Sequence, residues 1–337
     1  MANLPSCEDY EVSINVPRLI KCPKLSCGHV EKNAIGTTIN YVGGFCIVFP
    51  YYKSDDKKIA VRCWIASVDK AQDRTRKIAE ELKRINLPYF VNFEYEQEGI
   101  ATNSGVQPVV LMDWVSAKSL KDYIKDNLSR PDILRKLAAS FKTMVVDLHK
   151  ANISHGDLQH GNILIRDDGS LVLVDYDSMF VPSLTGYKDE IKGLAGYQHP
   201  ARWDNEYVTA KADYFSELII YTSIMALSYF PSLWTELKIE DTETLLFSAE
   251  DIKSGGAAPI FRKLDSHPEL KNLSAAIKKS LRCNSIDDLL PLEEAIITNS
   301  ERITGGIRAK WGKQHPIEKK EYCPDTTNTR AKWNRTN

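Results

Sequence analysis

Residues 155–165 read His-Gly-Asp-Leu-Gln-His-Gly-Asn-Ile-Leu-Ile, and residues 173–177 read Leu-Val-Asp-Tyr-Asp. The first stretch places Asp157 and Asn162 on a polar loop that runs into an apolar strand, and the second places Asp175 at the end of another apolar strand. Carboxylate and amide oxygens are ligands that Mg²⁺ prefers. Because such a loop can face such a strand end, the two stretches predict one centre for metal and phosphate.

These stretches resemble the catalytic loop, H-R-D-x-x-x-x-N, and the metal motif, D-F-G, of the protein-kinase-like superfamily. The overall order of motifs is similar to that of divergent bacterial Ser/Thr protein kinases, which are thought to work beside a metal-dependent phosphatase. The resemblance implies an α+β, two-lobed protein-kinase-like fold with a small β-rich N-lobe and a larger helical C-lobe. It also implies ATP and Mg²⁺ as cofactors, with Asp157 as the catalytic carboxylate and with Asn162 and Asp175 as the metal ligands.

Apolar periodicity predicts a first part rich in strands and a second part rich in helices. In the first part we expect strands within 39–52, 57–65, 89–95 and 109–115, and a helix at 68–85. In the second part we expect a helix at Pro131–Lys150, a short strand at 171–175 and helices between 212 and 297. The expected organisation is an N-terminal extension at 1–35, an N-lobe at 36–115, a C-lobe at 116–300 and a basic, mobile tail at 301–337.

The resemblance extends to a nucleotide cleft between the lobes. Residues 59–62 are similar to the strand motif V-A-I-K, with Arg62 in place of the lysine that grips phosphate. Residues 110–115 look like the strand that enters the hinge, where adenine meets backbone groups, with Met112 as gatekeeper. The residues that the resemblance implies in nucleotide binding are Gly43, Gly44, Val48, Ala60, Arg62, Met112, Asp113 and Val115.

Several positions depart from the family pattern. Only one of the three glycines of the family's glycine-rich loop is kept in residues 41–48. Ile78 stands where the helix glutamate is expected, which leaves Glu81 or a carboxylate of the metal motif as the partner of Arg62. The other replacements are Gln159 for lysine, Asp177 for the glycine of the metal motif, Leu194 for threonine and Ala201 for glutamate.

Beyond the metal motif, the chain looks like a protein kinase again. Residues 193–201, with Tyr197 and Pro200, are similar to the end of an activation segment that docks a polypeptide. Asp213 opens an apolar helix that looks like the family's buried central helix with its anchoring aspartate.

Three functions follow from this mixture. The retained Asp157, Asn162 and Asp175, together with the activation segment, favour a protein Ser/Thr kinase. The changes at the lysine, the glycine-rich loop and the helix glutamate favour a pseudokinase, which is a scaffold or switch that binds ATP without efficient turnover. The His-Gly-Asp sequence at 155–157 and the acid at Asp177 are also similar to small-molecule kinases of the aminoglycoside and choline kinase type. Incubation with labelled ATP and Mg²⁺ distinguishes turnover from binding alone.

Composition argues against other classes. A net charge of −1 over 337 residues gives no general attraction to nucleic acid. The longest apolar run, at 218–230, is shorter than the roughly 20 residues that cross a bilayer, and the first residues lack the features of a signal peptide. The seven cysteines are odd in number and irregularly spaced, which fits a reducing cytosol. Cys22, Cys27 and His29 have the spacing of half a metal site, but no second cysteine pair accompanies them, so we expect ordinary small residues there.

The tail at 301–337 carries nine basic and four acidic residues. Within it, Arg308-Ala309-Lys310-Trp311 recurs as Arg330-Ala331-Lys332-Trp333. Tryptophan supplies an apolar anchor and the cations supply steering toward an acidic surface, so a tail-binding partner is one interpretation. The alternatives are a chance repeat or a solvated tail that covers part of the helical lobe. The expected partners are therefore a protein substrate, a phosphatase and a tail-binding partner, in a cytoplasmic protein that binds neither nucleic acid nor membrane.

Overall fold

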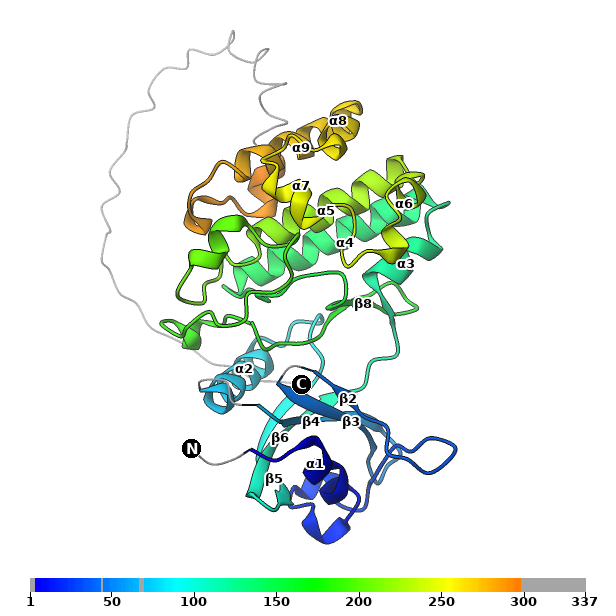
Figure 1. Cartoon of the computed structure of the whole chain (residues 1–337), viewed down its shortest axis with the longest axis vertical. Coiled ribbons are helices and arrows are strands. Elements are labelled where there is room, and N and C mark those ends of the chain that lie inside the picture. Colours follow the sequence, from blue (N-terminus) through cyan, green and yellow to red (C-terminus); the bar gives the residue numbers. More distant parts are fainter. Residues whose placement is uncertain (1–3, 44, 67–69, 298–337) are drawn as a thin grey trace, which may run out of the picture.

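The computed structural model describes residues 4–43, 45–66 and 70–297 of the chain. Gly44 and the predicted tail with its repeated motif lie outside the described residues. A lobe rich in strands and a lobe rich in helices lie one above the other, and the chain that follows strand β6 connects them (Figure 1). The expected two-lobed α+β architecture, with a β-rich N-lobe and a helical C-lobe, is confirmed.

The N-lobe is built on a six-stranded antiparallel sheet. Its strands follow the order β1-β3-β4-β6-β5, and β2 also pairs with β3. The strands are β1 (His29–Val30), β2 (Tyr41–Val42), β3 (Cys46–Tyr52), β4 (Lys58–Trp64), β5 (Phe93–Thr102) and β6 (Gly105–Asp113). The register pairs Val48 with Arg62 and Ala60 with Met112. Because directly opposed residues share a face, these four side chains point to the same side of the sheet, which is the side of the cleft.

One long helix, α2 (Ala71–Ile85), packs against this sheet. Its buried apolar residues Ile78, Ala79 and Leu82 recur at helical spacing, and Asn86 ends the helix in the left-handed conformation, with φ +49°. The helix predicted at 68–85 is present from Ala71 onward, and residues 67–69 lie outside the described part.

The N-terminal segment has structure that its sequence pattern did not reveal. It contains α1 (Cys7–Ile14) and the short 3₁₀ helices η1 (Pro17–Leu19) and η2 (Pro23–Leu25). A capping box between Ser6 and Asp9 starts α1. Tyr10 and Ile14 of α1 share one apolar core with Phe49 of the sheet. Residues 1–35, which we expected as an extension, therefore cover one face of the N-lobe where the structure describes them.

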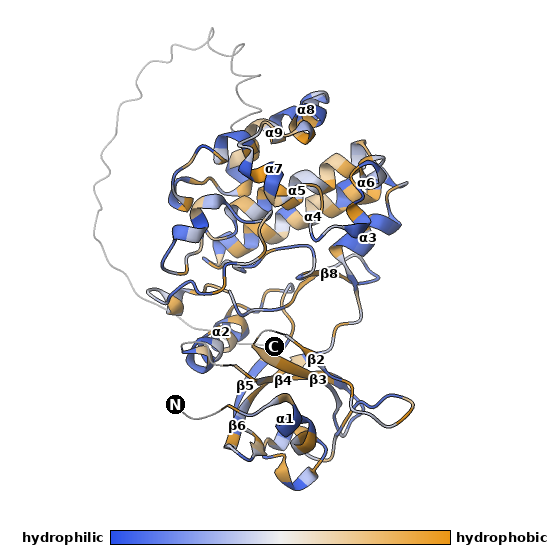
Figure 2. Cartoon of the chain, viewed as in Figure 1, coloured by the Kyte–Doolittle hydropathy of each residue, from blue (hydrophilic) through white to orange (hydrophobic). Residues whose placement is uncertain are grey.

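The C-lobe is arranged around a pair of long helices, α4 (Pro131–Lys150) and α5 (Tyr214–Tyr229). Helix α4 begins with proline in its first turn, where the missing N–H costs nothing, and it spans the predicted residues. Helix α5 is buried on nearly all sides, which explains why its sequence is mostly apolar rather than apolar along one face only (Figure 2). Around this pair lie α3 (Leu120–Asp126), α6 (Leu233–Glu236), α7 (Ala249–Lys253), α8 (Pro259–Asp265) and α9 (Pro268–Ser280), with the 3₁₀ helices η3 (Pro182–Leu184), η4 (Pro200–Asp204), η5 (Ile239–Asp241) and η6 (Ile286–Asp288).

A small second sheet faces the N-lobe. It contains β7 (Lys118–Ser119), β8 (Ile163–Ile165) and β9 (Leu171–Leu173) in that order. The catalytic-loop stretch precedes β8 and the metal motif follows β9, so the antiparallel pairing of these two strands brings both stretches to the floor of the cleft.

In the described part of the chain, none of the helices has the length and apolarity needed to cross a membrane. Over the same residues, no group of three His, Cys, Asp or Glu side chains is placed to hold a metal ion. Cys22 is buried and Cys27 is exposed, so these two cysteines and His29 do not form a preassembled site.

Candidate active site

A cavity of about 610 Å³ lies between the two lobes. It is lined by strands β3 and β4, by the connection after β6, and by the catalytic and metal motifs. The predicted site residues that line it are Gly43, Val48, Ala60, Arg62, Met112, Asp113, Val115, Asp157 and Asp175. Asn162 does not line the cavity itself but contacts Asp157 from below, as described next, and Gly44 lies outside the described residues.

The half of the cavity near the connection is apolar. Val48 and Ala60 line it from the sheet, while Leu164 and Val174 line it from the C-lobe. The rings of Tyr41 and Trp114 lie 6.1 Å apart between their centroids, and both residues line the cavity. Apolar walls beside the backbone of residues 112–115 suit a flat heteroaromatic ring.

The catalytic loop is held by a buried aspartate at the start of α5. The Asp213 carboxylate accepts hydrogen bonds from the backbone N–H groups of His155 and Gly156, the latter at 3.0 Å. Gly156 has φ +80°, and a Cβ at this position would lie 2.0 Å from the carbonyl oxygen of Ser178. Glycine therefore replaces the arginine of the family pattern because the backbone leaves no room for a side chain.

Asp157 receives hydrogen bonds from two directions. The Asn162 side-chain amide donates to its carbonyl oxygen at 2.8 Å and to its Oδ2 at 3.1 Å. The backbone N–H of Leu194 lies 3.3 Å from its Oδ1, close to Gly193, where a Cβ would lie 2.5 Å from the same oxygen. The backbone of Leu194 thus makes the contact that a threonine hydroxyl makes in the family pattern. Burial raises the pKa of Asp157 above its usual value.

The metal motif brings two further carboxylates into the cavity. Asp175 has φ +66°, a conformation that aspartate tolerates better than most residues. Burial, and then the charge of Asp177, raise the pKa of Asp175, while Arg62 opposes the rise. Asp157, Asp175 and Asp177 therefore all line the cavity, where burial and the neighbouring carboxylate oppose the charged form of Asp175.

Arg62 is buried under the sheet and pairs with Asp177. Arg62 is 7% exposed, and its Nη2 donates to Oδ2 of Asp177. Burial alone would lower the pKa of Arg62, but the carboxylate of Asp177 outweighs this effect and raises it. Of the two alternatives for the partner of Arg62, the structure has the carboxylate of the metal motif.

Helix α2 does not supply that partner. Glu81 pairs with Arg84 on its own helix, with 2.6 Å between Oε1 and Nη2. Glu80 pairs with Arg76 at 2.9 Å. Ile78, at the position of the family's helix glutamate, is buried in the core.

The donor set fits Mg²⁺ bound together with phosphate. Asn162 and Asp175 offer only oxygen ligands, and the described residues contain no cluster of three His, Cys, Asp or Glu side chains that would hold a metal alone. Mg²⁺ is usually bound by one or two carboxylates and by substrate phosphates, so two protein ligands beside a cavity are adequate.

The segment after the metal motif is fixed to the C-lobe by buried polar contacts. Arg202 pairs with Asp189 through two hydrogen bonds of 3.1 and 3.2 Å, and both residues are buried. The Tyr197 hydroxyl accepts a hydrogen bond from the backbone N–H of Leu245 at 3.0 Å and lies 2.7 Å from Nδ1 of His160. Leu194 and Ala201 depart from the family pattern, but the Arg202–Asp189 pair and the hydrogen bonds of Tyr197 fix the segment that contains them.

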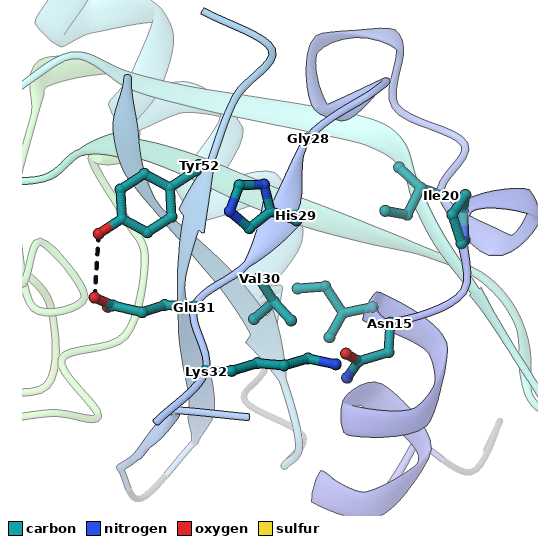
Figure 3. A pocket seen from close by; sticks show the side chains of 10 residues that line it. Asn15, Ile20, Gly28, His29, Val30, Glu31, Lys32 and Tyr52 are labelled. Carbon is teal, nitrogen blue, oxygen red and sulfur yellow. Dashed lines mark hydrogen bonds between the residues drawn. The ribbon is translucent and has the colours of Figure 1, made fainter. Parts of the chain in front are cut away.

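A second cavity, of about 530 Å³, lies on the outer face of the N-lobe (Figure 3). The ring of His29 stacks on Tyr52 with 5.3 Å between centroids, and the Tyr52 hydroxyl donates to Glu31 at 3.1 Å. Val30 and Ile14 line the apolar part of this cavity. None of the carboxylates of the catalytic and metal motifs lines it.

Sequence reasoning did not identify several residues of the main cavity. Trp114, Leu164 and Val174 line it, and the buried pair of Arg202 with Asp189 steadies the segment beside it. Leu164 follows the catalytic-loop stretch and Val174 precedes Asp175. The apolar residues next to the two motifs could therefore have predicted that these two side chains line the cavity. No local pattern marks the pairing of residues that lie far apart in the sequence.

Comparison with known proteins agrees with this geometry. A family model described as a protein kinase domain matches residues 36–281. The probable serine/threonine-protein kinase zyg-1 of Caenorhabditis briggsae is 27% identical over 191 residues, which are 54% of this chain and 25% of that protein. The probable serine/threonine-protein kinase PknB of Bifidobacterium longum is 26% identical over 166 residues, 46% of this chain and 24% of that protein. The serine/threonine-protein kinase pakG of Dictyostelium discoideum is 30% identical over 131 residues, 37% of this chain and 11% of that protein. The chain thus spans a quarter or less of the length of these relatives.

Proposed function

Because the chain belongs to the protein kinase family, we propose that it transfers the γ-phosphoryl group of ATP to Ser or Thr hydroxyls of a protein, itself included. The observation that carries this proposal is the meeting of Asp157, Asp175 and the Arg62–Asp177 pair at one end of a cavity whose other end is apolar. One end suits a purine ring, and the other suits a metal and phosphates.

Each side chain has a role that follows from its surroundings. Phosphoryl transfer depends on positioning and on charge neutralisation rather than on covalent help from the protein. Asp157, held by Asn162 and by the Leu194 N–H, orients the acceptor hydroxyl and accepts its proton. Asn162 and Asp175 would hold Mg²⁺, and the bound ion would supply positive charge beside the phosphates. Arg62 stays charged and contributes a cation beneath the sheet.

A second function is favoured by one observation. Arg62 already has a carboxylate partner within the metal motif, so part of the charge that would grip phosphate is neutralised. The pairing of Arg62 with Asp177 favours an ATP-binding switch without efficient turnover. The carboxylate at Asp177 itself favours a small-molecule kinase. The ordered segment 189–202 favours a polypeptide acceptor instead, because it is fixed next to Asp157.

The test is a phosphoryl-transfer assay with labelled ATP, Mg²⁺ and a generic protein acceptor. The variant Asp157→Asn should lose about 10²–10⁴-fold in rate, the range typical of a positioned acid or base, while ATP affinity changes little. Its control is Asp167→Asn, which removes the same charge from an exposed turn of the C-lobe. Turnover of wild type and Asp157→Asn at equal rates would exclude the kinase and leave the switch. Aminoglycosides and choline, offered in place of the protein, test the third function.

The wider setting of the kinase is also part of the proposal. The similarity of its motif order to that of bacterial kinases suggests a partner phosphatase that removes the phosphate again. The repeated Arg-Ala-Lys-Trp sequences offer a site for a tail-binding partner, and changing Trp311 and Trp333 together to alanine should abolish capture of that partner. The odd number and irregular spacing of the seven cysteines support action in the cytoplasm, where thiols stay reduced.

A further inference from the structure

The second cavity, on the outer face of the N-lobe, is built almost entirely from residues that precede the matched kinase domain. Of the ten residues that line it, only Tyr52 lies within residues 36–281. The other nine lie between Ile14, at the end of α1, and Lys32, which follows β1. We call this space the outer cavity. None of the groups proposed for phosphoryl transfer lines it, so that reaction does not account for it.

The outer cavity has the size and the walls of a site for a small molecule. Its volume is about 530 Å³, and sites for small ligands usually measure about 300–1,000 Å³. The ring of His29 stacks on Tyr52 with 19° between the planes, and His29 is exposed. One face of the His29 ring is therefore left to the cavity, which Val30 and Ile20 also line (Figure 3). A flat aromatic ring gains there from apolar burial and from stacking.

Glu31 is the one carboxylate among the lining residues, and both of its oxygens are engaged. Oε1 accepts a hydrogen bond from the Tyr52 hydroxyl at 3.1 Å, and Oε2 pairs with Nζ of Lys58 at 2.7 Å. The hydrogen bond from Lys58 lowers the pKa of Glu31, so this carboxylate is charged and its charge is offset. None of the acidic residues of α1 lines the cavity.

Lys32 supplies a cation at the other end of the outer cavity. Its neighbour Glu31 is paired elsewhere, and Lys32 forms no ion pair with any residue that the structure describes. Figure 3 shows its side chain extending toward Asn15. The amide of Asn15 is fixed there, because its Nδ2 donates to the backbone carbonyl of Glu11 at 2.8 Å and to Oγ1 of Thr38 at 2.9 Å. This polar end therefore favours an anionic group.

We propose that the outer cavity binds a small aromatic anion, with its ring on His29 and its anionic group at Lys32. Contact with Val30 and Ile20 holds the ring, and a charge-assisted hydrogen bond from Lys32 holds a carboxylate. The ligand needs both parts. A neutral aromatic molecule leaves Lys32 without a partner, and an inorganic anion leaves the apolar wall and the face of His29 uncovered.

Calorimetric titration of the full chain with 2-naphthoate, a planar aromatic carboxylate, tests the site, and 2-naphthamide is the uncharged probe of similar shape. Wild type should bind 2-naphthoate roughly tenfold more tightly than 2-naphthamide, which is the effect of one hydrogen bond to a charged group. Lys32→Gln should lose this preference and keep its affinity for 2-naphthamide. Lys271→Gln removes the same charge from an exposed position of α9 and should keep the preference. No binding of 2-naphthoate to wild type at millimolar concentration, or an equal preference in Lys32→Gln and wild type, would overturn the proposal.

Two further variants test the ring contact and the location. His29→Ala removes an exposed ring and leaves the charge of Lys32, so it should weaken the binding of both probes by roughly three- to tenfold. Ala60→Met narrows the nucleotide cleft and not the outer cavity, so its affinity for 2-naphthoate should equal that of wild type, whether or not the chain binds ATP. A loss of 2-naphthoate affinity in Ala60→Met but not in His29→Ala would place the probe in the cleft and exclude the outer cavity as its site.

Discussion

The cavity between the lobes and the base of the segment after the metal motif each contain an arginine paired with an aspartate, and the two pairs differ in exposure. In the cleft, the side chains of Arg62 and Asp177 are 9% and 23% exposed. At the base of the segment, those of Arg202 and Asp189 are both 1% exposed. A fully sealed pair cannot exchange its partner for water, whereas a pair that opens onto a cavity can. The difference favours a structural role for Arg202, and it agrees with the proposed ligand-binding role of Arg62.

The sealed pair should give the largest effect on stability. Arg202→Met keeps most of the side-chain volume but leaves Asp189 buried without a cation, which typically costs about 3–5 kcal/mol. We expect a loss of that size in the free energy of unfolding, measured by urea denaturation of the full chain. The matched variant in the cleft, Arg62→Met, should lose much less, because Asp177 can turn to solvent.

A double variant distinguishes lost charge from lost packing. Asp189→Leu combined with Arg202→Met removes both buried charges, and such replacements are often neutral or stabilising. The double variant should therefore be more stable than Arg202→Met alone. A double variant that is as unstable as the single one would show that the hydrogen bonds from Arg202 to Gln198 and to the backbone of Ala212 matter more than the ion pair.

The open pair should give the largest effect on nucleotide binding. Arg62→Ala is expected to weaken ATP affinity or turnover at least tenfold, which corresponds to about 1.4 kcal/mol. Asp177→Asn keeps the cation and removes its partner, so Arg62 becomes free to meet phosphate and the effect should be smaller. Calorimetric titration with Mg-ATP measures both variants. An unchanged affinity in Arg62→Ala would mean that Arg62 is a structural residue of the sheet.

The sequence was sufficient to predict the fold and the proximity of Asp157, Asn162 and Asp175, because both follow from local patterns. The spacing of Asp157 and Asn162, and the apolar strands around Asp175, predicted a floor to the cleft that the structure contains. Helix α4 spans the predicted residues because its apolar period and its first-turn proline agree. These features depend on residues that lie close together in the chain, so a local sequence pattern is enough to predict them.

The pairings that give each arginine its role could not be predicted in the same way. Arg62 and Asp177 are separated by 115 residues, and the choice between Asp177 and Glu81 depends on the tertiary position of α2. Helix α1 was missed for a different reason: it has only eight residues, too few for a clear period, although its capping box of Ser6 and Asp9 was a readable signal.

A third charged cluster, in the C-lobe, differs from both arginine pairs because its contribution to stability is expected to depend on pH. His149 lies between Glu217 and Glu293, with its ring nitrogens 3.0 Å from each carboxylate. Burial lowers the pKa of His149, but the two carboxylates outweigh this and raise it to about 9. Burial raises the pKa of Glu217 to about 7. Protonated His149 is therefore the favoured form up to about 9, held by hydrogen bonds to Glu217 and Glu293.

The sign of the effect follows from the raised pKa of His149. The stabilisation is fully present below the ordinary histidine value of 6.5 and is lost as the pH rises through 9. We expect a loss of about 1 kcal/mol between pH 7.5 and 10, which is the size of a typical net hydrogen-bond contribution in a partly exposed site. Thermal unfolding across this range measures it, with His149→Gln as the comparison. A slope in His149→Gln that equals that of wild type would assign the dependence to other groups.

The smallest expected effect comes from the helix carboxylate that Asp177 replaces as the partner of Arg62. Glu81 pairs with Arg84 on α2, and surface pairs three residues apart contribute only about 0.2–0.5 kcal/mol to a helix. Glu81→Gln should therefore change the free energy of unfolding by less than about 0.5 kcal/mol and the ATP affinity by less than twofold. Measured beside Asp177→Asn, it tests whether α2 takes any part in placing Arg62. A tenfold loss of ATP affinity in Glu81→Gln would contradict this expectation. It would indicate that α2 rotates when nucleotide binds, so that Glu81 pairs with Arg62. The Arg62–Asp177 pair of this structure would then belong to the nucleotide-free state.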